Sequence, residues 1–170
     1  MINYQTYRPK IHTGDILAFP HKECKSWYDL QVQSVLFATK SPMAHVAMAW
    51  RIGPRVMVFE AVVPKVRVFP LSAMGNFYHF PMHLTYQSDA VDCALREVGK
   101  EVEYSKWEGI KALFRLNDPA DKKTQCAEFV KNMLLTNNII LPGRAVPGDV
   151  VEDLMQLGIK QAMVHNEILP

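Results

Sequence analysis

The chain has 170 residues and a formal net charge of +2, with 49% hydrophobic and 21% charged residues. These values are typical of one globular domain that is large enough to bury a substantial core. The small net charge, without a run of Lys or Arg, argues against nucleic acid as a partner.

The N-terminal residues 1–8 contain no apolar stretch that resembles a signal peptide. No apolar window is long enough to cross a bilayer, so we expect no stable membrane insertion. The three cysteines are odd in number and widely spaced, which favours free thiols over a disulfide framework. These features predict a cytoplasmic protein and leave its oligomeric state open.

The first half of the sequence carries strand signals separated by turns. Alternating side chains over residues 44–50 and 56–62, with a turn at residues 52–55, predict a β-hairpin. A helix is expected over residues 26–39. The expected strands are residues 14–19, 44–50, 56–62, 65–69 and 77–80.

The second half carries helix signals. Ser88 is a candidate N-cap and Gly99 a stop signal for one amphipathic helix. Ser105 and Glu108 form a capping-box pattern ahead of another, and Pro147 is expected at the start of the last. The expected helices of this half are residues 88–98, 105–114, 124–134 and 147–157.

The order of these elements, a meander of antiparallel strands followed by helices, predicts an α+β fold. No internal repeat, low-complexity tract or linker divides the sequence. We therefore expect a single domain that spans residues 1–170.

Cys126 is the first candidate for a reactive residue. Thr124 is a good N-cap candidate, which places Cys126 in the first turn of a helix. Unpaired N–H groups and the positive end of the helix dipole favour a thiolate there. The position therefore suits a nucleophile, although a cysteine taken alone is more often a small buried hydrophobe.

Two residues of the predicted hairpin support this reading of the cysteine. His45 shares a strand face with Ala47 and Ala49, whose small side chains leave room beside the imidazole. Glu60 lies on the same predicted strand face as apolar residues. An ionised carboxylate there is costly unless a partner group compensates its charge. We expect the hairpin to bring Glu60 beside His45 and so fix the tautomer and orientation of the imidazole. The alternatives are a structural or surface histidine and a carboxylate at a strand end.

Four stretches of the sequence, taken in order, resemble one family. They are Gly14-Asp15-Ile16, Thr39-Lys40-Ser41-Pro42-Met43-Ala44-His45-Val46-Ala47-Met48, Phe59-Glu60-Ala61-Val62 and Cys126-Ala127-Glu128-Phe129-Val130. Their order and spacing are similar to the circularly permuted papain-like branch of the NlpC/P60 superfamily. Within that branch the sequence resembles the YiiX-like proteins, and it resembles the lecithin–retinol acyltransferase-like enzymes more distantly. The resemblance extends over nearly the whole chain.

This resemblance implies a circularly permuted papain-like fold, in which a small antiparallel sheet packs against helices and the histidine precedes the cysteine. It implies that Cys126 is the nucleophile, His45 the general base and acid, and Glu60 the orienting third member. Ala44 departs from the family, which often has Ser before the histidine. That change removes a hydroxyl near the site but none of the three roles.

The function predicted from these residues is that of a cysteine-dependent hydrolase, an amidase or peptidase that acts through a thioester intermediate. The expected partner is a small-molecule, peptide or lipid amide substrate. Two alternatives stay open. One is a thioesterase or acyltransferase that acts on lipids, and the other is a binding module in which the triad is vestigial.

The other Cys and His residues carry weaker signals. The proximity of His12, His21 and Cys24 suggests a metal site, but no second Cys/His pair follows at a ligand spacing. We therefore expect no metal and no cofactor.

Cys93 lies off the apolar stripe of its helix and is expected to be an incidental thiol. His79 and His83 flank Pro81 and are expected to lie in a solvent-exposed connection.

Overall fold

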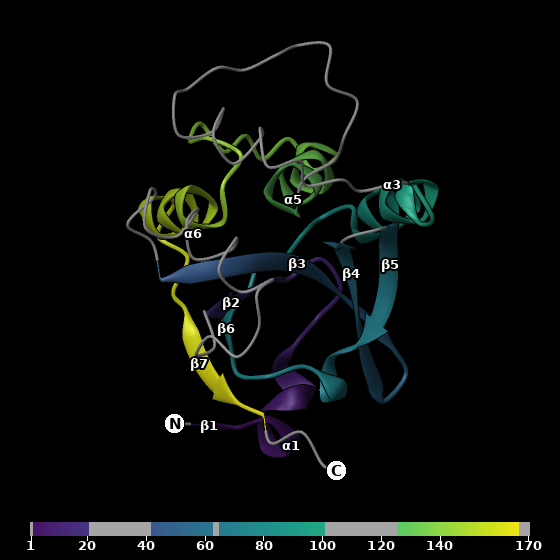
Figure 1. The fold of residues 1–170 in the computed structure, drawn as a ribbon, viewed down its shortest axis with the longest axis vertical. Coiled ribbons are helices and arrows are strands. Elements are labelled where there is room, and N and C mark those ends of the chain that lie inside the picture. Colours follow the sequence, from purple (N-terminus) through teal and green to yellow (C-terminus); the bar gives the residue numbers. More distant parts are fainter. Residues whose placement is uncertain (1, 21–41, 63–64, 101–125, 167–170) are drawn as a thin grey trace, which may run out of the picture.

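A seven-stranded sheet forms the centre of the computed structural model, which describes residues 2–20, 42–62, 65–100 and 126–166 (Figure 1). Its strands are β1 (Ile2–Asn3), β2 (Ile16–Pro20), β3 (Met43–Ile52), β4 (Arg55–Val62), β5 (Lys65–Pro70), β6 (Phe77–Phe80) and β7 (Ala162–His165). They lie in the spatial order β1-β7-β6-β2-β3-β4-β5. Neighbouring strands are antiparallel except β1 and β7, which are parallel.

The α+β class is confirmed, but the sheet is larger than expected and mixed. The sequence predicted β2 to β6, and the two additional strands come from near the two ends of the chain. Ile2 pairs with Val164 and Asn3 with His165, which creates the parallel edge. The helices expected over residues 26–39 and 105–114 lie outside the described residues.

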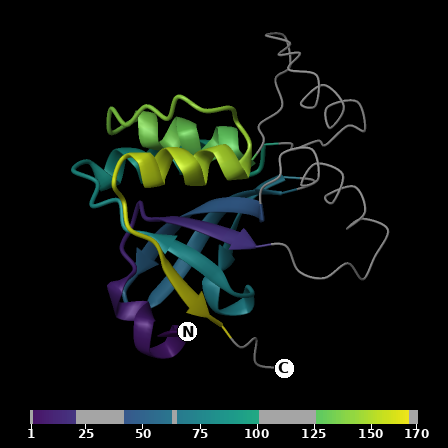
Figure 2. The ribbon, with the colours of Figure 1, turned by 90° about the vertical axis from the view of Figure 1, so that its left-hand side faces the viewer.

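Among the described residues, three helices cover one face of the sheet: α3 (Gln87–Glu97), α5 (Cys126–Leu135) and α6 (Pro147–Gln156) (Figures 1 and 2). α5 and α6 both pack on β3. One core lies between these helices and the sheet, and its fully buried large side chains include Met48, Phe59, Phe80, Phe129 and Leu154.

The ends of two helices test the sequence signals. α6 begins at Pro147, as predicted. α3 begins at Gln87, so Ser88 lies inside the helix and the expected cap is wrong. The N-cap position belongs to Tyr86, whose side chain makes no capping hydrogen bond.

The opposite face of the sheet carries short helical segments, namely α1 (Tyr4–Tyr7) and the 3-10 turns η1 (Arg8–Lys10) and η2 (Leu71–Ala73). A second core lies on this side, and it includes Tyr4, Leu17, Val58, Leu71 and Phe77. The sheet is therefore packed on both faces, with α1 opposite the helical layer (Figure 2).

The outer edge of β5 is partly covered by the backbone that follows α3. Val66 donates its N–H to the carbonyl of Lys100 at 3.0 Å, and Gly99 donates to the carbonyl of Val66 at 2.8 Å. Gly99 has a φ of +87°, which residues with a side chain rarely adopt. Its predicted place just beyond a helix is confirmed. None of the described helices is long and apolar enough to span a bilayer.

Candidate active site

Strands β3, β4 and β5 hold a buried carboxylate between an imidazole and a guanidinium. Glu60 on β4 is 1% exposed. Its Oε2 lies 2.9 Å from Nε2 of His45 on β3. Arg67 on β5 donates through Nε to Oε1 of Glu60 at 2.8 Å, and its Nη2 lies 2.8 Å from the same oxygen. Both oxygens of the buried carboxylate are therefore engaged.

The alternation of side chains along the strands explains this arrangement. Ala49 and Val58 are partners in the β3–β4 hairpin and therefore lie on one face of the sheet. His45 and Glu60 lie four and two residues from that pair, so they share its face. Glu60 and Arg67 are direct partners between β4 and β5. The contact between His45 and Glu60 that alternation predicted is present in the structure.

Cys126, on α5, contacts the imidazole of His45. It is the first residue of α5 in the described part of the chain, and it is 5% exposed. Its side chain is hydrogen-bonded to His45. Because Nε2 of His45 faces Glu60, Nδ1 is the ring nitrogen left for the sulfur. The expected N-cap, Thr124, lies outside the described residues.

These contacts set the charges at the site. Burial alone would lower the pKa of His45, but the hydrogen bonds and negative charges of Cys126 and Glu60 raise the pKa to about 9. Burial would raise the pKa of Glu60, but His45 and Arg67 outweigh burial and hold the pKa below its ordinary value. At neutral pH the imidazole is therefore protonated and the carboxylate ionised.

The groups follow one another in the order thiol, imidazole, carboxylate and guanidinium. A protonated imidazole beside a thiol favours the thiolate, which is the nucleophilic form of cysteine. The same imidazole can donate its proton to a leaving group. The arrangement of Cys126, His45 and Glu60 is therefore suited to acyl transfer.

Sequence reasoning missed Arg67. Arg67 alternates with Val66 and Val68, a pattern that indicates the solvent-facing side of a strand. The available signal was the buried carboxylate of Glu60, which requires a cationic partner, and β5 is the next strand in the chain.

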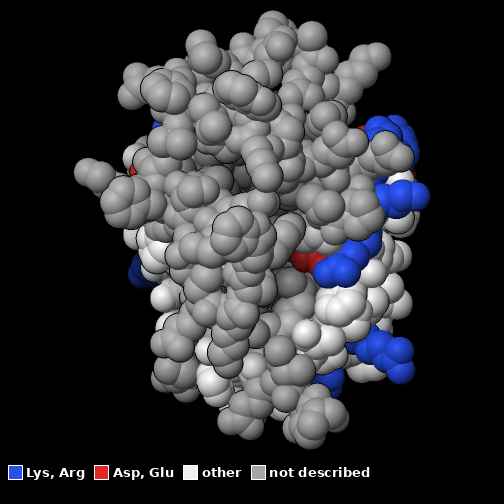
Figure 3. Space-filling view, viewed as in Figure 1, with Lys and Arg blue, Asp and Glu red and all other residues white. Residues whose placement is uncertain are grey.

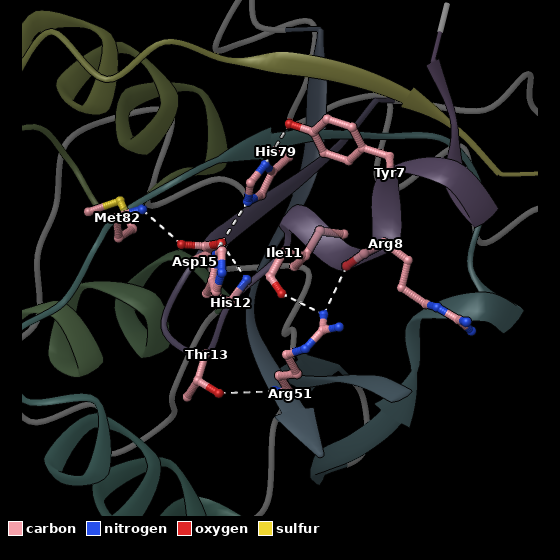
Figure 4. Close-up of polar contacts among 9 residues, drawn as sticks. All are labelled: Tyr7, Arg8, Ile11, His12, Thr13, Asp15, Arg51, His79 and Met82. Carbon is pink, nitrogen blue, oxygen red and sulfur yellow. Dashed lines mark hydrogen bonds and ion pairs between the residues drawn. The ribbon is translucent and has the colours of Figure 1, made fainter. Parts of the chain in front are cut away.

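A second buried polar group surrounds Asp15 (Figure 4). Nε2 of His79 lies 2.8 Å from Oδ2 of Asp15, and the hydroxyl of Tyr7 lies 3.0 Å from Nδ1 of His79. The backbone N–H of Met82 donates to Oδ1 of Asp15 at 2.9 Å. His79 is 1% exposed, so the expected exposed position of this residue is wrong. The reason is that β6 pairs with β2 and turns His79 towards Asp15, whereas His83 beyond it is exposed.

The same region ties the N-terminal segment to the sheet (Figure 4). The backbone N–H of His12 donates to Oδ2 of Asp15 at 2.7 Å. Nη1 of Arg51, on β3, donates to the carbonyls of Arg8 and Ile11 at 2.9 Å each. These contacts hold the residues before β2 against the second core.

Within the described residues, no group of three His, Cys, Asp or Glu side chains is arranged to bind a metal. His12 approaches Asp15, but His21 and Cys24, the other parts of the possible metal site, lie outside the described residues. Cys93 is half-buried, and burial, followed by the charge of Glu97, raises the pKa of its thiol. That shift disfavours the thiolate at Cys93.

No protein-family model matches the chain, and no curated protein matches it. A crystal structure of the metalloprotein yiiX from Escherichia coli O157:H7 is similar, with a TM-score of 0.56 and 21% sequence identity. The match covers 79% of this chain and 70% of that chain. At this identity the likeness shows the fold, and it supports the YiiX-like relationship at that level. The wider papain-like superfamily and the circular permutation stay predictions.

Proposed function

We propose that this chain is a cysteine-dependent hydrolase that cleaves a peptide-like or lipid-linked amide. In this proposal Cys126 is the nucleophile, His45 the general base and acid, and Glu60 the residue that orients the imidazole. The observation that carries it is the hydrogen-bonded order of these three side chains at the start of α5. The proposal includes membership of the circularly permuted papain-like NlpC/P60 superfamily. The likeness to the yiiX fold and the order of the motifs support that membership.

The reaction begins when the thiolate of Cys126 attacks the carbonyl carbon of the amide. A C–S bond forms and the carbonyl electrons move to the oxygen, which becomes an oxyanion. The backbone N–H of Cys126, at the positive end of the helix, is the natural donor to that oxyanion. When the oxyanion collapses, the C–N bond breaks and the amine takes a proton from His45.

The second half of the reaction regenerates the thiolate. Neutral His45 removes a proton from water, and the resulting hydroxide attacks the thioester carbonyl. The C–S bond breaks, the acid leaves and the imidazolium forms again beside the thiolate. Glu60 keeps Nε2 of His45 engaged throughout, so that Nδ1 faces the reacting groups.

This mechanism uses no metal, although the yiiX neighbour is described as a metalloprotein. In the part of the chain that the structure describes, the donor set does not fit a metal ion. Arg67 places a fixed cation on one oxygen of Glu60, and His45 occupies the other. A divalent ion at this carboxylate would have to displace the imidazole and overcome the repulsion of the guanidinium.

An activated acyl ester tests the proposal without knowledge of the natural substrate. Single-cysteine proteins are treated with p-nitrophenyl acetate at about pH 6.5, and the acetyl adduct is followed by mass spectrometry. Cys24→Ser with Cys93→Ser keeps Cys126, and Cys24→Ser with Cys126→Ser keeps Cys93. We expect acetylation of Cys126 at least about tenfold faster than that of Cys93, because only Cys126 has a protonated imidazole beside it.

Two variants assign the roles. Adding His45→Ala to the protein that keeps Cys126 should reduce its acetylation to the level of Cys93. Folded Cys126→Ala should release no nitrophenolate above the background of the other thiols. Equal and slow acetylation of Cys126 and Cys93 would instead indicate a binding module and contradict the proposed hydrolase.

A further inference from the structure

The guanidinium of Arg67 is the part of the site for which the proposed reaction gives no role. Both of its contacts to Glu60 use one oxygen, Oε1, and leave Oε2 to His45. The guanidinium carbon also lies 4.4 Å from the centre of the Phe69 ring, two residues along the same strand. Arg67 is thus held by a carboxylate and an aromatic ring, although its side chain is 50% exposed.

We propose that Arg67 is a positioning residue of this site. It holds one oxygen of Glu60 so that the other faces His45, and its charge weakens the hold of Glu60 on the imidazolium proton. The proposal rests on the proposed hydrolase for its purpose, because an imidazole that must give up its proton in each turnover cannot be held too tightly. The contacts themselves do not depend on the reaction.

The positioning follows from the geometry of a carboxylate. Glu60 is 1% exposed, so a turn of its carboxylate away from both partners would leave an ionised oxygen buried without a donor. Two N–H groups on Oε1 restrict that turn, since an Arg side chain presents its donors as a rigid fork. Oε2 then has a fixed place at 2.9 Å from the ring nitrogen.

The effect of Arg67 on the imidazolium proton of His45 follows from the charged groups around the ring. The groups that face His45 in the described part of the chain are Cys126 from α5 and Glu60 from β4, while Phe19 from β2 contributes an aromatic ring. Both titratable groups stabilise the imidazolium. Arg67 is bound to Glu60 and offsets part of that attraction. Removal of the guanidinium should therefore increase the affinity of His45 for its proton.

The chain offers a matched control on another element. Arg144 binds Asp149 through Nε at 2.8 Å and Nη2 at 3.1 Å, and its side chain is 52% exposed. The Arg144→Gln change removes an ion pair between an arginine and a carboxylate that does not include Glu60. Basic side chains gather on the side of the molecule where β5 and α3 lie (Figure 3). The loss of the Arg67 charge therefore leaves other positively charged side chains on this side of the molecule.

The test is an NMR titration of the His45 ring protons in full-length protein that carries Cys126→Ala, so that the result does not depend on the thiol. Arg67→Gln should raise the titration midpoint of His45 by about 0.5–1 pH unit, as expected for loss of a partly solvated charge several ångströms away. Arg67→Lys and Arg144→Gln should leave the midpoint within about 0.2 unit. Arg67→Met keeps the contact with Phe69 and should behave like Arg67→Gln if the latter does not fold.

The route through Glu60 is tested in a second background. Glu60→Gln should lower the midpoint of His45. Arg67→Gln added to it should raise the midpoint by less than it does alone, because without the carboxylate only the direct charge effect of Arg67 remains. An unchanged or lower midpoint in folded Arg67→Gln, or an equal rise in both backgrounds, would overturn the assignment. These outcomes are separate from the acetylation of Cys126, which tests the hydrolase itself.

Discussion

Replacement of Asp15 by Ala is the strongest test of the buried polar group that the sequence did not predict. Asp15 is 1% exposed and accepts the N–H of Met82 and that of His12, while its Oδ2 faces Nε2 of His79. The Asp15→Ala change leaves these three donors without their acceptor. Those of Met82 and His79 are buried, whereas water can reach that of His12.

The magnitude follows from the two buried donors. A buried donor without an acceptor costs about 1–3 kcal/mol, so two of them together cost about 2–6 kcal/mol. We therefore expect Asp15→Ala to lower the free energy of unfolding by about 2–6 kcal/mol. In urea this corresponds to a midpoint that is lower by roughly 2 M, from the usual dependence of stability on denaturant.

Tyr7→Phe provides the graded comparison. Burial, and after it the charge of Asp15, raises the pKa of Tyr7, so the phenol keeps its proton and can donate to Nδ1 of His79. His79 then carries its own proton on Nε2, towards Asp15. Tyr7→Phe removes one neutral hydrogen bond and should cost only about 1 kcal/mol. A loss below about 1 kcal/mol for Asp15→Ala would refute this account of the network. A loss for Tyr7→Phe that exceeds the loss for Asp15→Ala would refute it as well.

Further outcomes follow from three other features. Gly14→Ala should be destabilising by roughly 1–3 kcal/mol in thermal unfolding, because φ is +89° and a Cβ there would overlap a side-chain carbon of Leu84. Gly53→Ala, at φ +56° in open space, is its milder control. His45 should contribute up to about 3 kcal/mol of stability, because its pKa is raised from 6.5 to about 9. That contribution is complete below about pH 6.5 and is lost as the pH rises through about 9. Urea unfolding at several pH values would detect this pH dependence of stability, and His45→Gln should abolish it. The pKa of Glu60 is lowered, so its contribution is present above about pH 4.5 and disappears as the pH falls through the folded value. Glu60→Gln should slow acetylation of Cys126 less than His45→Ala does, because the amide keeps a hydrogen-bond acceptor, and equal losses would contradict the orienting role.

Periodicity and turn signals in the sequence predicted those parts of the fold that depend on residues close together in the chain. Alternation over the hairpin predicted that His45 and Glu60 share a face, and apolar spacing predicted a helix over the residues that follow Cys126. β1 has two residues and carries no measurable periodicity, and its partner β7 lies at the other end of the chain. Neither strand could be predicted from its own residues.

The errors at single residues have the same origin. The strand that contains His79 was predicted, but the placement of its side chain depends on Asp15, 64 residues earlier in the chain. Arg67 has an ordinary pattern for a solvent-facing residue and acquires its role only from the register with Glu60. Pairing between strands decides both positions, across 64 residues for His79 and seven for Arg67.

The two outer edges of the sheet affect how the protein behaves at high concentration. An unpaired strand edge is a template on which another chain can add a strand and start aggregation. On one side the sheet ends in β1, which offers only Ile2 and Asn3, and on the other side Gly99 and Lys100 occupy backbone groups of Val66. Little backbone at these positions is left for a neighbouring molecule to pair with. A substitution that displaces Gly99 would reopen the β5 side and should first be noticed as a loss of solubility.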